Sequence, residues 1–275
     1  MTYSTITVEQ ATPHLGAFVS GVDIAAPLSN AAVGDLHKAF ADHLVLFFRD
    51  QHFTPASQKA FGRLFGDLHT HPNTPGLPDH PEVMPIHADG NSKRVAGEWW
   101  HSDVSCDPEP PLGSILYLHT VPPCGGDTLF ASMYAAYETL STRMKTYLEG
   151  LTAVHSGERL YRRTNRLLNI DDTGRVFPSA THPVVRTHPV TGRKALFVNR
   201  TFTDRITELP DDESDGVLEF LYDHAERPDF QMRFQWDAHS VAFWDNRAVQ
   251  HLAIWDYFPQ VRSGTRVTIK GDTPV

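Results

Sequence analysis

Short apolar runs recur along the whole chain, and most of them have the period of two that is typical of β-strands. In residues 230–236 four apolar side chains alternate with three polar ones, which predicts a half-buried strand. The continuous apolar runs at 45–48 and 241–244 are typical of strands buried on both faces. Residues 184–187 and 194–198 flank a turn sequence and predict a hairpin. The pattern therefore predicts a mainly β protein.

Helical spacing is less frequent and lies between the strands. Helices are expected to begin at Ser29, at Thr54 with proline next, at Ser132 and at Ser141, because these hydroxyl residues precede helical patterns. A fifth helix is expected over 211–226. Many short strands with Pro and Gly turns and a few outer helices predict a double-sheet jelly roll, whose mouth can hold a ligand.

Two long stretches lack this periodicity. Residues 69–98 are rich in His, Pro, Gly and Asn, with a strand candidate only at 83–86, and we expect an active-site loop here because long irregular stretches are usually functional. Residues 155–182 carry several arginines and little periodicity, which indicates either a solvated loop or a mobile lid over a site. The arginines are Arg159, Arg162, Arg163 and Arg166.

Composition excludes several classes of protein. The 275 residues are enough for one large domain or two small ones. A net charge of −9 without a basic tract argues against nucleic-acid binding, so an anionic ligand would have to be held by local arginines. Two cysteines outside any CxxC motif, no signal peptide and no long apolar segment predict a cytoplasmic protein without a membrane span.

A His-x-Asp pair at His101 and Asp103 stands between aromatic residues and Val104. In a strand, residues two apart point to the same face, so this imidazole and carboxylate would meet at one point. One more imidazole would complete the 2-His-1-carboxylate face of non-haem Fe(II) oxygenases. A second pair, at His87 and Asp89, runs into a loop sequence, so we expect only the first pair to bind metal.

Five segments occur in the order and near the spacing of the taurine dioxygenase/TfdA family of Fe(II)/2-oxoglutarate dioxygenases. They are WHSD at 100–103, GGDT at 125–128, HPVVRTHPVTGRKALFVN at 182–199, WDNRAVQH at 244–251 and RSGTRVTIKGD at 262–272. With the N-terminal third they cover nearly the whole chain, which therefore resembles this family. The resemblance implies one domain over residues 1–275, with a double-stranded β-helix of the jelly-roll, clavaminate synthase-like type and flanking helices.

Taken residue by residue, the resemblance implies that His101, Asp103 and His251 are the Fe(II) ligands and form the catalytic centre. It implies that Thr128 and Arg262 hold the far carboxylate of 2-oxoglutarate, since a guanidinium can grip a carboxylate in a fork. O2 is then the second co-substrate, and hydroxylation of a small molecule accompanies conversion of 2-oxoglutarate to succinate and CO2.

The substrate-binding residues implied by the resemblance are Arg266, His71, Phe202 and Trp244. Arg266 matches the arginine that holds the anion in sulfonate- and sulfate-acting members, and His71 matches a histidine that contacts sulfonate. Phe202 and Trp244 are candidates for the apolar wall. The expected substrate is an alkylsulfonate, a sulfate ester, an aryloxyalkanoate, or a small carboxylic or amino acid.

The chain departs from taurine dioxygenase at Thr74, where that enzyme has tyrosine, and at Gly97, where it has asparagine. Arg200 also replaces an acidic residue. The resemblance therefore supports iron and co-substrate binding and leaves the substrate open. It also implies a homodimer or homotetramer.

Two other functions use the same residues. A zinc hydrolase could employ the same three ligands, although zinc sites usually prefer a closed tetrahedral set and Arg262 and Thr128 would have no task in it. A non-catalytic jelly-roll binding protein would be indicated by loss of a ligand, and none is lost. Retention of Asp103 also argues against a halogenase, in which the position of the carboxylate is usually vacated.

Overall fold

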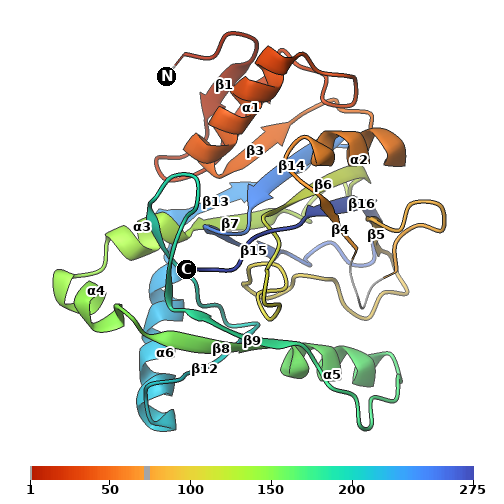
Figure 1. The fold of residues 1–275 in the computed structure, drawn as a ribbon. Coiled ribbons are helices and arrows are strands. Elements are labelled where there is room, and N and C mark those ends of the chain that lie inside the picture. Colours follow the sequence, from red (N-terminus) through yellow and green to blue (C-terminus); the bar gives the residue numbers. More distant parts are fainter. Residues whose placement is uncertain (1, 71–74) are drawn as a thin grey trace.

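The computed structural model describes residues 2–70 and 75–275, and within them two β-sheets pack face to face (Figure 1). The larger sheet has eight strands in the order β1-β2-β3-β14-β6-β16-β4, and β5 also pairs with β16. Its strands are β1 (Thr7–Gln10), β2 (Ala17–Ser20), β3 (Val45–Phe48), β4 (Leu68–His69), β5 (Val83–Ala88), β6 (Gly113–Thr120), β14 (Ser240–Asp245) and β16 (Arg262–Ile269). The smaller, antiparallel sheet consists of β13 (Gln231–Phe234), β7 (Thr128–Ser132) and β15 (Val249–Ala253).

The alternation of side chains along the strands divides the core into two layers. On β14, Ala242 and Trp244 belong to the layer between the sheets, whereas Val241 and Phe243 belong to the layer outside the larger sheet. Phe47 and Phe234 stack across the inner layer with ring centroids 4.2 Å apart. The predicted double-sheet jelly roll is thereby confirmed.

Two helices cover the outer face of the larger sheet, α1 (Asn30–His43) and α2 (Pro55–Arg63). They begin where the sequence predicts, because the hydroxyls of Ser29 and Thr54 accept hydrogen bonds from the first backbone N–H groups. Phe40 of α1 stacks on Phe243 at 3.9 Å.

The remaining elements lie mostly on the opposite side of the molecule from α1 and α2 (Figure 1). The predicted helix starts at Ser132 and Ser141 are confirmed. The helices are α3 (Met133–Glu138), α4 (Thr142–Leu148), α5 (Glu158–Leu167), α6 (Asp211–Ala225) and the 3-10 helix η1 (Pro228–Phe230). The strands are β8 (Thr152–Ser156), β9 (Ser179–Pro183) and β12 (Thr203–Ile206), which form one sheet, and the predicted hairpin of β10 (Val185–Thr187) and β11 (Lys194–Leu196).

The solvated-loop alternative for residues 155–182 was wrong in its first half, where the chain forms α5, and the lid alternative stays a prediction. This helix is short, and Asn165 is its one buried residue, so no broad apolar stripe marks it in the sequence. The predicted loop at 69–98 begins with β4 and contains β5, which is two residues longer than the expected strand. No helix in the described ranges is long and apolar enough to cross a membrane.

Candidate active site

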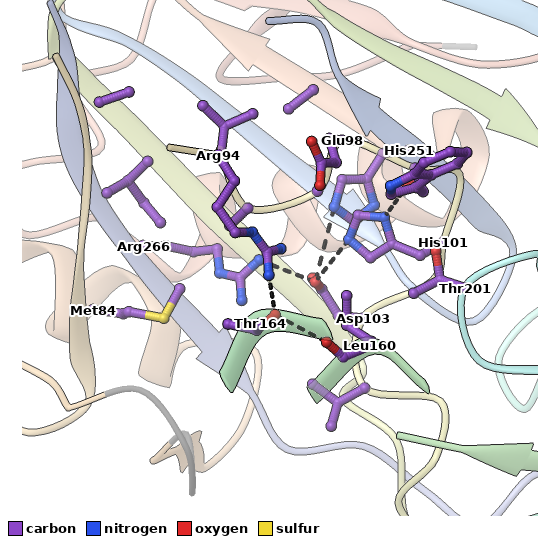
Figure 2. Close-up of a pocket in the computed structure, with 18 of the residues that line it drawn as sticks. Met84, Arg94, Glu98, His101, Asp103, Leu160, Thr164, Thr201, His251 and Arg266 are labelled. Carbon is purple, nitrogen blue, oxygen red and sulfur yellow. Dashed lines mark hydrogen bonds and ion pairs between the residues drawn. The ribbon is translucent and has the colours of Figure 1, made fainter. Parts of the chain in front are cut away.

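The three predicted iron ligands converge at the edge of the inner layer (Figure 2). His101, Asp103 and His251 are buried, and their potential ligand atoms all lie within 4.8 Å of one another. Asp103 Oδ1 is 3.6 Å from His101 Nε2 and 3.8 Å from His251 Nε2. Apart from the undescribed residues 1 and 71–74, the chain has no other group of three such side chains placed to hold a metal.

The fold joins the two imidazoles through their backbones. His251 lies on β15, and its N–H donates to the His101 carbonyl at 2.9 Å while the His101 N–H donates to the His251 carbonyl at 3.2 Å. The prediction that His101 and Asp103 share one strand was wrong, because only His101 pairs, in an isolated bridge, and the chain turns at Asp103. Asn246, which follows β14, explains the turn: its side-chain oxygen accepts from the Asp103 N–H at 3.3 Å, in place of a neighbouring strand.

Each imidazole is held in a form that can bind a metal. His101 Nδ1 lies 2.7 Å from the Trp99 carbonyl, which can only accept, so Nδ1 carries a proton and Nε2 is the nitrogen that faces the possible metal position. Burial, reinforced by the neighbouring His101, holds the pKa of His251 well below its usual value, so that ring is neutral. The His251 ring lies 4.6 Å from that of Trp244.

Asp103 is held as a carboxylate by two donors. Ser114 Oγ donates to its Oδ2 at 2.8 Å and Arg266 Nη1 to its Oδ1 at 3.0 Å. Burial by itself would raise the pKa of Asp103, but the positive charge of Arg266 opposes it, and the pKa lies well below its usual range. Sequence reasoning missed Ser114. It could have been recognised as a polar residue at an inward-facing position of the apolar strand β6.

These donors fit a divalent transition metal. Without a proton on His101 Nε2, two electron-rich atoms, this nitrogen and Asp103 Oδ1, face each other at 3.6 Å. A cation between them would satisfy both, and two imidazoles with one carboxylate on a single side leave positions open toward the cavity. The isolated pair of His87 and Asp89 is partly exposed and lies outside this group.

Arg262 and Thr128 form a second polar group on facing sheets. Arg262 on β16 is only 6% exposed; its Nε donates to the Gly126 carbonyl at 3.1 Å and its Nη2 to Thr128 Oγ1 at 3.4 Å. Within the described part of the chain it forms no ion pair, and burial lowers its pKa. A buried guanidinium without a carboxylate partner is suited to receive an anion.

One cavity of about 430 Å³ connects these groups. Its walls include the three predicted ligands, both co-substrate residues, Arg266 and the predicted apolar residues Phe202 and Trp244. His71 and Thr74 lie outside the described residues. The arginines noted in the stretch 155–182 do not line the cavity; they are Arg159, Arg162, Arg163 and Arg166.

Sequence reasoning did not predict helix α5, which lines this cavity and lies within the range expected to be a solvated loop or a mobile lid. Leu160, Tyr161, Thr164 and Asn165 of α5 line it together with Leu168 and Ile170. Two further arginines, Arg94 and Arg175, also line it and were missed; the only hint of Arg94 was its place in the predicted active-site loop.

Gly97 lies directly against a predicted ligand. A Cβ at this position would be 3.1 Å from His101 Cε1, and φ is +82°, a conformation that favours glycine. The backbone thus approaches the imidazole where taurine dioxygenase, by the resemblance above, carries an asparagine.

The comparison with known proteins agrees with this geometry. The family model for "Taurine catabolism dioxygenase TauD, TfdA family" matches residues 7–268. A putative alpha-ketoglutarate-dependent sulfonate dioxygenase of Schizosaccharomyces pombe is 38% identical over 97% of this chain and 70% of its own length. The alpha-ketoglutarate-dependent sulfate ester dioxygenase of Pseudomonas putida is 35% identical over 95% of this chain and 88% of its own.

A solved structure titled as a putative alpha-ketoglutarate-dependent taurine dioxygenase from Burkholderia xenovorans superposes with a TM-score of 0.86. It is 36% identical, and the match covers 98% of this chain and 94% of that one. The chain therefore belongs to the TauD/TfdA family and is a 2-oxoglutarate-dependent dioxygenase.

Proposed function

We propose that this dioxygenase hydroxylates a small anionic organic molecule at a centre in which His101, Asp103 and His251 hold Fe(II). The enzyme uses Fe(II), 2-oxoglutarate and O2. When bound, the iron and its co-substrate supply the oxidation: 2-oxoglutarate becomes succinate and CO2, and one oxygen atom enters a substrate C–H bond. The observation that carries the assignment is the meeting of two imidazoles and one carboxylate on the wall of a single cavity.

Arg262 and Thr128 would bind the far carboxylate of 2-oxoglutarate. The Thr128 oxygen already accepts from Trp236 Nε1 at 3.0 Å and from Arg262 Nη2 at 3.4 Å, so its hydroxyl hydrogen is available to donate to a carboxylate. The Arg262 guanidinium lies over the Trp236 ring, 5.5 Å from its centroid, which fixes its plane.

Arg266 would bind the anionic group of the substrate next to the iron. One of its nitrogens is engaged with Asp103, whereas its buried Nε has no hydrogen-bond partner in the described ranges. A sulfonate or sulfate oxygen from the cavity side would satisfy that N–H. Sulfonates and sulfate esters are the substrates in the names of two relatives, and hydroxylation beside the heteroatom would give a product that fragments.

Phe202, Trp244 and α5 would exclude water from the reacting atoms. Phe202 and Trp244 are almost fully buried. Residues 155–182 would act as a lid and 69–98 as the active-site loop, because both supply cavity-lining side chains. We further propose a cytoplasmic homodimer or homotetramer; Cys106 and Cys124 are both free, as a reducing compartment requires.

Succinate formation tests the proposal. The protein would be incubated with Fe(II), 2-oxoglutarate and air, together with alkylsulfonates, alkyl sulfates, aryloxyalkanoates or amino acids. We expect at least one anionic class to stimulate succinate release in proportion to O2 uptake. Turnover supported by Zn(II) without O2 would contradict the dioxygenase assignment and favour a hydrolase. Size-exclusion chromatography with light-scattering detection measures the oligomeric state.

A further inference from the structure

Arg94 is a cation in the active-site cavity that the reaction described above does not use. It lies between β5 and His101, is half-buried, and lines the cavity together with Arg266 (Figure 2). Its Nη1 donates to Thr164 Oγ1 on α5. The Thr164 hydroxyl donates its own hydrogen to the Leu160 carbonyl at 2.9 Å, so it acts toward Arg94 only as an acceptor that orients the guanidinium.

No carboxylate neutralises Arg94 through an ion pair in the part of the chain that the structure describes. The acid that favours its charged form is Glu98, but Glu98 lies 3.6 Å from the guanidinium of Arg163 and is partly neutralised there. Burial, followed by the repulsion of Arg163, lowers the pKa of Arg94 despite Glu98. A half-buried charge without a pair is costly unless a ligand compensates it.

The charges expected in the loaded cavity leave Arg94 unmatched. Fe(II) and Arg262 together carry three positive charges, which equal the three negative charges of 2-oxoglutarate and Asp103; Asp103 makes its own ion pair with Arg266. Arg266 and Arg94 then remain, one positive charge each. Arg175, which also lines the cavity, lies with its guanidinium 5.8 Å from the Phe177 ring centroid. A substrate with a single sulfonate or sulfate on Arg266 would still leave Arg94 uncompensated.

We propose that Arg94, oriented by Thr164, forms a second anion subsite, and that the substrate is a dianion whose two acidic groups are joined by an apolar chain. This inference rests on the proposed function. One acidic group would bind Arg266 beside the iron and the other Arg94 beneath α5. Apolar cavity residues are available to contact the chain between them, namely Met84, Ile86, Val95, Leu160, Leu168 and Ile170.

Matched probes isolate the charge at the far end of the substrate. The probes are 4-sulfobutanoate and 6-sulfohexanoate, each compared with its neutral terminal amide, which has nearly the same size. Binding to the full chain would be measured by calorimetry with Mn(II) and N-oxalylglycine in place of iron and co-substrate. In the wild-type protein we expect one carboxylate to bind at least about 10-fold more tightly than its amide, as a partly desolvated ion pair allows.

Substitution at Arg94 should remove this preference alone. In Arg94→Met the dissociation constant of the amide divided by that of the carboxylate should fall to about one, while the amide binds as in the wild type. Arg94→Lys should retain most of the preference for the carboxylate. Arg166→Met is the matched control, because Arg166 is an exposed arginine of α5 outside the cavity, and it should leave the ratio unchanged.

Two results would overturn the subsite. One is equal binding of carboxylate and amide by the wild-type protein at both chain lengths. The other is an equal loss of both ligands in Arg94→Met, which would show that Arg94 only fastens α5 across the cavity. If succinate formation responds to other anions in either case, the proposed function survives. If no anion binds and none stimulates succinate formation, the proposed function and the subsite fail together.

Discussion

Replacing Ser114 with alanine should weaken metal binding without disturbing the fold. The Ser114 hydroxyl donates at 2.8 Å to Oδ2 of Asp103, the oxygen that does not face the imidazoles. It lies on β6, is fully buried, and also lies 3.3 Å from Thr268 Oγ1. Alanine keeps the backbone and most of the volume, so the change removes one hydrogen bond to the carboxylate.

The expected size of this effect follows from the kind of bond. A buried hydrogen bond to a charged group contributes about 1.5 to 3 kcal/mol, which corresponds to about 10- to 150-fold in affinity. Replacing a group that orients a metal ligand lowers metal affinity by about the same factor. Arg266 still donates to Oδ1 in the variant, so Asp103 stays ionised while its orientation loosens.

The assay is competitive titration of the metal-free protein with Mn(II) against a chelating dye. Ser240→Ala is the matched control. Ser240 is a buried serine at the end of β14 that lies away from Ser114, and its hydroxyl accepts from Arg49 at 2.7 Å. We expect weaker Mn(II) binding in Ser114→Ala only. A change below about 3-fold, or an equal change in Ser240→Ala, would refute the reasoning that the hydroxyl holds the carboxylate in position.

Four further predictions follow from the same structure. Asp103→Ala should abolish 2-oxoglutarate-dependent O2 uptake, measured with an oxygen electrode, and full uptake would contradict its role as a ligand. Arg262→Gln should raise the 2-oxoglutarate concentration needed for half-maximal succinate release by at least about 10-fold while Mn(II) affinity persists, since it removes the charge that would pair with the buried 2-oxoglutarate carboxylate. An unchanged requirement would exclude Arg262 from this role. Gly97→Ala should lower Mn(II) affinity, because its Cβ would be 3.1 Å from His101 Cε1 at a φ of +82°, and unaltered affinity would show that the loop relaxes freely. Burial lowers the pKa of His155 from 6.5 to about 3, so the unfolded chain takes up a proton below pH 6.5 that the folded chain refuses until about pH 3. The free energy of unfolding should therefore be undiminished by His155 above pH 6.5 and should decrease on acidification, by about 2 kcal/mol at pH 5. The fall in Tm of the metal-free protein between pH 7 and pH 5 should be smaller in His155→Gln.

The sequence predicted best what is encoded locally. Helix starts at Ser29, Thr54, Ser132 and Ser141 are recognisable because a hydroxyl and the next few N–H groups suffice to form each cap. The buried strands are recognisable because apolar runs permit few other structures. The jelly roll followed from their number and spacing.

What the sequence did not reveal depends on how distant segments meet. Ser114 becomes important only because β6 directs it toward Asp103, and Arg94 only because α5 lies across the cavity. Helix α5 itself was missed because it is short and has no broad apolar stripe in the sequence. The turn at Asp103 depends on Asn246, far along the chain, which local pattern cannot show.

The reciprocal backbone bridge between His101 and His251 has a consequence for the life of the protein in a cell. A nascent polypeptide lacks one of the proposed ligands until His251 on β15 has been made, so the proposed site can capture metal only after that strand has assembled. Iron then stabilises the finished fold alone, by about 2.7 kcal/mol at a free concentration one hundred times the dissociation constant. We expect iron starvation to leave newly made chains less stable and more readily degraded, so that enzyme abundance follows the supply of its metal.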